Sequence, residues 1–247
     1  MYQLLKYEMI KKWKLFLIVL STVILAEGFI LYQLLIKENW STPLFVFSFM
    51  AFGGMFFVLI DSINSFSLEL RRKSGYMLFL TPRNGYQIVG AKVMISLLEL
   101  FIGFFVYIGL ARINYSVLKN TISDEANEFM DLLVDLISPN INIYELFYVS
   151  LNLILQWLLI IMSAYLAIIL IKTLLANKRF TGFISFIFFI VITSGLIYFS
   201  SVINNYLSFN LNLSETVVVN ILSIINLLIC GIIYIICGRL VDKNLSL

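Results

Sequence analysis

Six long runs of apolar residues constrain this chain more than any other feature of its sequence. The runs cover residues 15–35, 44–66, 88–110, 146–171, 180–202 and 217–237. Each is long enough for a helix to cross a bilayer, which takes roughly 20 mainly apolar residues. Within hydrocarbon only helices and closed barrels satisfy the backbone, and the runs lack the alternating pattern of barrel strands. We therefore expect an all-α integral membrane protein whose 247 residues form a single transmembrane domain, residues 1–247.

The distribution of lysine and arginine predicts the orientation of these spans. With the N-terminus inside the cell, 14 of the 17 basic residues fall in inner segments and 3 in outer ones. Short loops on the inner side of a membrane carry such an excess of positive charge. We therefore expect a multi-pass plasma-membrane protein with both termini in the cytoplasm and no cleavable signal peptide.

Two segments outside the apolar runs have the pattern of amphipathic helices. Residues 1–14 place apolar side chains at helical spacing among lysines, which is typical of an interfacial helix on an anionic membrane surface. The alternative is simple basic flanking of the first span. Residues 123–138 have one apolar and one acidic face, with Ser123 as a candidate N-cap. This pattern predicts an amphipathic helix at the outer surface, and the alternative is a solvated helical loop without a substrate role.

Three acidic residues, Glu27, Asp61 and Glu99, fall within the predicted spans. Ionisable groups there are costly and normally face protein or water. Asp61 lies at the depth of Lys92, which predicts an ion pair between the second and third spans, with separate snorkelling of the two side chains as the alternative. Glu27 and Glu99 have no basic residue at their depth, so we expect hydrogen bonds to polar side chains or contact with a cationic substrate. The candidate amide partners are Asn152, Gln156, Asn220 and Asn226.

The segment between the second and third spans combines basic and apolar residues. It reads ELRRKSGYMLFLTPRNGYQIVGAK from Glu69 to Lys92. A helix with one apolar strip and one basic edge fits the groove of a partner protein, and Pro82 would end such a helix before the third span. The alternative is a passive interfacial loop.

With this segment after the second of six spans, the chain resembles the permease subunits of type-2 ATP-binding-cassette exporters, in the small six-span form typical of low-GC Gram-positive bacteria. The matching residues are Glu69, Gly75, Leu78, Leu80, Pro82, Arg83, Gly90 and Lys92. Two features depart from the family pattern: Tyr76 stands where threonine is commoner, and the spacing from Gly75 to Pro82 is about two residues short. The match is therefore clearest from Pro82 to Lys92.

The resemblance implies an N-terminal elbow helix and a cytoplasmic coupling helix at residues 69–82, opened by Glu69. The residues that would contact a separate cytosolic ATPase are Glu69, Arg71, Arg72, Gly75, Tyr76, Leu78, Leu80, Pro82 and Arg83. It also implies that the chain forms half of an export pathway in a bacterial plasma membrane, paired with a second copy or a related permease. The cargo would be a peptide antibiotic, a lipid or another amphiphile, and resistance to antimicrobial peptides is one such role.

The chain itself lacks the motif G-x-x-x-x-G-K-[ST] that cradles nucleotide phosphates. We therefore expect no enzyme activity and no cofactor or metal in this chain, with ATP and Mg²⁺ on the partner ATPase, and no nucleic-acid partner. The sequence has no histidine, which argues against an intramembrane serine or metal hydrolase. Two alternatives stay open: an ion-coupled secondary carrier using Glu27 and Glu99, and a non-transporting assembly or sensory subunit.

The charge distribution makes the topology testable. In intact cells, a cysteine replacing Arg83 should not react with a membrane-impermeant maleimide, whereas one replacing Lys119 should react. The native Cys230 and Cys237 both lie in the last apolar run and give the background. Labelling at position 83 from outside would reverse the orientation and remove the basis for a cytosolic partner.

Overall fold

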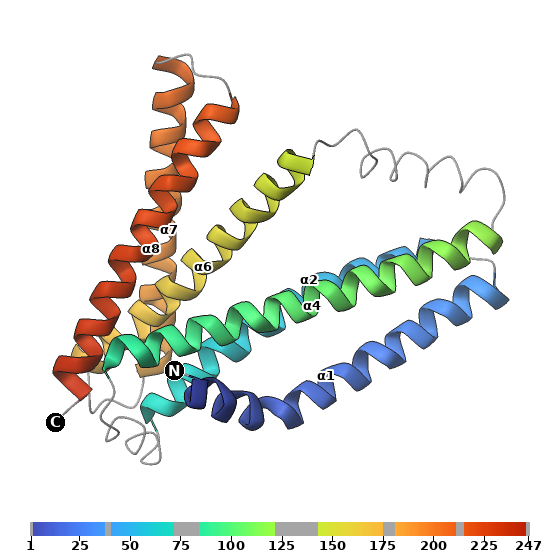
Figure 1. The fold of residues 1–247 in the computed structure, drawn as a ribbon, viewed down its shortest axis with the longest axis horizontal. Helices are drawn as coiled ribbons and strands as arrows, with labels where there is room; N and C mark the ends of the chain where they lie inside the picture. The colour runs from blue at the N-terminus through green and yellow to red at the C-terminus, as the bar shows by residue number, and fades with distance from the viewer. Residues whose placement is uncertain are drawn as a thin grey trace. The chain divides into compact units, whose positions relative to one another are not determined.

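The structure is a computed structural model that describes residues 2–37, 41–71, 84–121, 143–174, 181–210 and 215–245. Within these ranges the chain is helical almost throughout, and no strand occurs (Figure 1). The elements are α1 (Tyr2–Ile36), α2 (Ser41–Arg71), α4 (Gly85–Thr121), α6 (Ile143–Leu174), α7 (Thr181–Asn205), the short π-helical segment η1 (Tyr206–Asn210) and α8 (Glu215–Leu245).

Among the described residues, 6 helical stretches are long and apolar enough to cross a membrane. They are Glu8–Ile36, Ser41–Leu70, Gly85–Val117, Ser150–Thr173, Gly182–Ser208 and Val217–Lys243. Each overlaps one of the predicted apolar runs, so the prediction of an all-α membrane protein with six spans is confirmed. The helices extend beyond the runs because backbone hydrogen bonding continues into polar flanks that hydropathy does not count.

The starts of two helices follow from local sequence. Pro43 stands in the first turn of α2, where its missing N–H removes no helical hydrogen bond. The carbonyl of Asn84, directly before α4, accepts a hydrogen bond from the N–H of Gln87 at 2.8 Å. Asn84 therefore occupies the N-cap position, where asparagine is favoured.

The structure describes some of the predicted amphipathic segments and not others. Residues 2–14 form the first turns of α1 without a break before the apolar run (Figure 1); whether they lie on a membrane surface stays a prediction. Glu69 and Arg71 lie at the end of α2. Of the proposed coupling segment, residues 72–83 fall outside the described residues, as does the expected outer helix at 123–138.

The chain divides into two compact units, and α2 and α4 each contribute to both. The α6–α8 unit comprises Asp61–Met94 and Phe147–Leu247, and the α1 unit comprises Tyr2–Ile60 and Ile95–Leu146.

Helix α6 is far more buried than α7 within the α6–α8 unit. In the most apolar 18-residue window of α6, 56% of the residues are buried, against 0% in that of α7. Tyr165 of α6 is fully enclosed, and its ring packs against Phe66 of α2 with ring centroids 4.4 Å apart. Helices α7 and α8 run side by side (Figure 1). Because the outer surface of α7 is apolar, lipid is its natural surrounding.

The α1 unit has a smaller apolar core. Ile30 and Leu34 of α1 are buried and pack against Val46 and Phe47 of α2 and Val117 of α4. Phe47 in turn lies edge-on to Tyr107 of α4 at a centroid distance of 5.6 Å. The three helices of this unit are therefore joined by one continuous group of side chains.

A glycine on α8 permits the closest approach in the α6–α8 unit. A Cβ on Gly238 would lie 2.3 Å from Cδ1 of Tyr86 and 2.5 Å from its Cε1, closer than real contacts allow. The ring of Tyr86 is also tilted against Tyr234 of α8 at 6.0 Å. Gly231, on the same helix, has open space where its Cβ would stand.

We expect Gly238→Ala to lower the free energy of unfolding by about 1–3 kcal/mol, because the added methyl overpacks the contact with Tyr86. The matched control Gly231→Ala should be neutral or stabilising by up to about 1 kcal/mol, as alanine favours helix. Thermal unfolding of the purified variants checks both. Equal stability of the two variants would contradict the close approach of α4 and α8.

Candidate functional site

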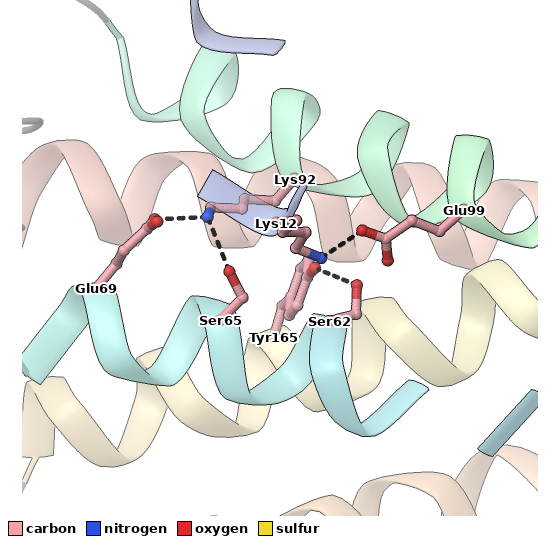
Figure 2. A network of polar contacts seen from close by, with 7 residues as sticks. All are labelled: Lys12, Ser62, Ser65, Glu69, Lys92, Glu99 and Tyr165. Atoms are coloured by element: carbon pink, nitrogen blue, oxygen red, sulfur yellow. Dashed lines mark hydrogen bonds and ion pairs between the residues drawn. The ribbon is translucent and has the colours of Figure 1, made fainter. Parts of the chain in front are cut away.

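A buried ion pair joins α2 and α4 in the α6–α8 unit. The ammonium of Lys92 lies 2.7 Å from Oε2 of Glu69 and donates a hydrogen bond to Oγ of Ser65 at 3.4 Å (Figure 2). The side chains of Lys92 and Glu69 are only 4% and 11% exposed. Breaking such a pair is costly because the remaining charge stays away from water.

The pair follows from the spacing of residues along α2. Asp61, Ser65 and Glu69 recur every four residues, so they share one face of the helix. Lys92 forms an ion pair with Glu69, at the far end of this face. The predicted pair of Lys92 with Asp61 stays a prediction.

The position of Glu69 differs from the one implied by the family resemblance. Glu69 lies in the last turn of α2, not at the start of a new helix. A carboxylate there faces the negative end of the helix dipole, which disfavours it unless a cation lies nearby. Lys92 supplies that cation.

The two helix ends that flank residues 72–83 are also bonded by α6 and α8. Lys172, in the last turn of α6, donates to the carbonyl of Leu70. The N–H of Gly85, the first residue of α4, donates to Oδ1 of Asp242 on α8. Such bonds satisfy groups that a helix end leaves without an intrahelical partner. We call these two bonds, together with the Glu69–Lys92–Ser65 contacts, the helix-end clamp.

Two tyrosines reinforce the clamp. The hydroxyl of Tyr234 on α8 donates to the carbonyl of Tyr86 on α4 at 2.7 Å. The hydroxyls of Tyr165 and Ser62 are hydrogen-bonded at 3.2 Å (Figure 2). The end of α2 and the start of α4 are thus fixed to the rest of the unit by polar contacts as well as apolar ones.

A second set of contacts joins α1 and α4 in the α1 unit. The ammonium of Lys12 lies 2.6 Å from Oε1 of Glu99 (Figure 2), and Nδ2 of Asn114 donates to Oε2 of Glu27 at 3.3 Å. Both contacts join residues 87 positions apart, and Val117 packs against the core that holds Ile30. From Lys12 to Glu27, about 22 Å along the axis of α1, each contact residue on α1 meets the residue 87 positions later on α4. The two helices therefore run parallel in one fixed register.

The structure changes the expected partners of the two mid-span glutamates. The expectation that Glu99 has no basic partner is wrong, because helix α1 continues through its basic flank and Lys12 pairs with Glu99. Glu27 is bonded by Asn114, which lies beyond the predicted end of the third span. No hydropathy signal marks Asn114, and only the register of α1 against α4 identifies it.

The amides proposed on the fourth span do not reach these glutamates in any described contact. Oδ1 of Asn152 accepts a hydrogen bond from the hydroxyl of Ser223 on α8, and Gln156 is exposed on α6. The sequence indicated Asn152 as a candidate partner of the glutamates, whereas it is hydrogen-bonded to Ser223 of α8. Within the described ranges no group of three or more His, Cys, Asp or Glu side chains is placed to hold a metal ion.

A double-mutant cycle tests the buried pair. Lys92→Met should lower the free energy of unfolding by about 3–5 kcal/mol, because it leaves the Glu69 carboxylate buried without its cation. Combining it with Glu69→Gln should restore much of that loss. Chemical denaturation of the four proteins gives the coupling, and Lys37→Met at an exposed position serves as the control. Additive effects of the two substitutions would show that the pair is not energetically coupled.

The chain matches no family model, no curated protein and no solved structure. Two features of the chain itself bear on its function: the helix-end clamp in the α6–α8 unit and the register of α1 against α4 in the α1 unit.

Proposed function

We propose that this chain is the membrane-spanning subunit of an ATP-driven exporter of the type-2 ATP-binding-cassette class. The observation that carries the proposal is the helix-end clamp. A segment that only links two spans needs no fixed ends, whereas a segment that transmits force does. Here both flanking helix ends are bonded to other helices of the same unit.

The clamp gives a route for movement from a cytosolic partner into the membrane. A displacement of residues 72–83 acts first on the end of α2 and the start of α4. The Glu69–Lys92 pair makes these two ends move together, and Lys172 and Asp242 pass the displacement to α6 and α8. Packed helices respond to such a force as rigid bodies because protein interiors are close-packed.

The composition of residues 72–83 supports a protein partner. The segment contains Arg72, Lys73 and Arg83 beside the apolar strip from Tyr76 to Leu80. Apolar anchors with a charged edge are typical of segments that lie in a groove of a partner. An ATPase domain with an acidic rim around an apolar groove would complement it.

The remaining parts of the assembly follow from what this chain lacks. Its sequence has no phosphate-binding loop, so ATP and Mg²⁺ would be bound by separate cytosolic ATPase subunits. Six spans would form half of the pathway, completed by a second copy or a related permease in a bacterial plasma membrane. The cargo class is a peptide antibiotic, a lipid or another amphiphile. An ion-coupled carrier is disfavoured because Glu99, one of its two relay groups, is ion-paired with Lys12.

The coupling experiment compares Gly75→Trp with the matched control Gly231→Trp, which adds the same side chain at an open position on α8. Both variants should insert normally. In proteoliposomes with the ATPase, Gly75→Trp should reduce export of cationic peptides per ATP hydrolysed by about tenfold or more, because the bulky side chain obstructs the contact with the ATPase. The control should export as the unmodified protein does.

Unchanged export in Gly75→Trp would overturn the proposal. So would the absence of a nucleotide-hydrolysing protein cross-linked to a cysteine that replaces Leu78 in native membranes.

A further inference from the structure

At the Glu27–Asn114 contact and on Tyr107, three buried oxygen atoms lack hydrogen-bond partners within the described part of the chain. They are Oε1 of Glu27, Oδ1 of Asn114 and the hydroxyl of Tyr107. Glu27 is only 8% exposed, and its other carboxylate oxygen accepts the bond from Asn114. Buried polar atoms are nearly always bonded, so these three atoms require an explanation.

The three residues lie on α1 and α4, which the Glu27–Asn114 bond joins. Tyr107 and Asn114 are two turns apart on α4 and therefore share a face. Glu27 on α1 is bonded to Asn114. A Cβ on Gly54 of α2 would be in ordinary contact with Tyr107, at 3.5 Å from its Cε2 and 3.9 Å from its hydroxyl.

The contrast with Glu99 shows what the Glu27 position lacks. Both acids lie on the same pair of helices in the same register. Glu99 has the ammonium of Lys12 at 2.6 Å, whereas Glu27 has only an amide. A carboxylate buried without a cation is costly. We propose that Glu27, Asn114 and Tyr107 form an intramembrane binding site for one primary ammonium group of a ligand.

The number and type of oxygen atoms without hydrogen-bond partners favour a primary ammonium over other cations. Such a group carries one positive charge and three N–H donors and accepts no hydrogen bond. The site offers one negative charge and three oxygen acceptors without partners. A divalent metal ion would require more charged ligands than Glu27 supplies.

The surface near the site fits the apolar part of an amphiphile. Ile24, one turn before Glu27 on α1, is 62% exposed, and Leu25 is 74% exposed. In the proposed complex an alkyl chain lies against these side chains, and its ammonium group displaces the side chains that cover the three buried oxygens. The binding site does not depend on the proposed function. Only the identification of the bound amphiphile with the exported cargo rests on it.

Binding of radiolabelled dodecylamine to the full chain in lipid nanodiscs tests the site, with protein-free nanodiscs as the partition blank. We expect one saturable site per chain. Glu27→Gln should weaken it by about tenfold or more, the size expected for a lost charge-assisted hydrogen bond. Tyr107→Phe should weaken it by a smaller factor. The matched control Tyr32→Phe, which removes an exposed hydroxyl of α1, should bind as the unmodified chain does.

A ligand series on the unmodified chain keeps the test decisive if a variant does not fold. Dodecyltrimethylammonium has the same charge but no N–H donor, so it should bind at least about tenfold more weakly than dodecylamine. Equal binding of dodecylamine and dodecyltrimethylammonium, equal binding to Glu27→Gln, or no saturable component would each overturn the site. Because no ATP or ATPase is present, these outcomes leave the exporter proposal unaffected. Conversely, a failed coupling experiment leaves the amine site unaffected.

Discussion

A charge held away from water requires a partner, and in this protein that requirement determines which helix faces meet. The Glu69–Lys92 pair shows the effect most directly. Both side chains are nearly buried, so α2 and α4 have to present these residues to each other. Lys172 and Asp242 then complete the bonding of the same helix ends. The apolar packing of Phe66 on Tyr165 adds contact area, but it does not by itself select one register, because apolar contacts are not directional.

The same constraint operates in the α1 unit. Apolar side chains alone would allow α1 to pack against α4 at several positions along the helix axis, because one leucine or isoleucine can take the place of another in such contacts. The Lys12–Glu99 pair and the Asn114–Glu27 bond share one offset and exclude the others. Polar contacts between membrane helices thus contribute specificity even where their net stabilisation is modest.

The six membrane-spanning helices could be predicted from the sequence, but the residue contacts between them could not. The spans follow from the length of the apolar segments, because helices and closed barrels are the only structures that satisfy the backbone within hydrocarbon. The ends of the helices could not be predicted from hydropathy, since α4 continues to Thr121 while the apolar run stops at Leu110. Partners depend on the rotation and offset of two helices, which hydropathy does not encode. For that reason the sequence missed Lys12 for Glu99 and Asn114 for Glu27, and gave no role to Tyr107.

The contact of Gly238 with the ring of Tyr86 has a consequence for finding relatives of this chain. The ring occupies the volume that a side chain at position 238 would need, so the two positions cannot vary independently. A homologue with the same packing would combine an aromatic ring at the first position with glycine at the second, or a smaller residue at the first with a larger one at the second. Because that paired substitution rule follows from packing volume and not from overall identity, it gives a criterion for judging distant sequences.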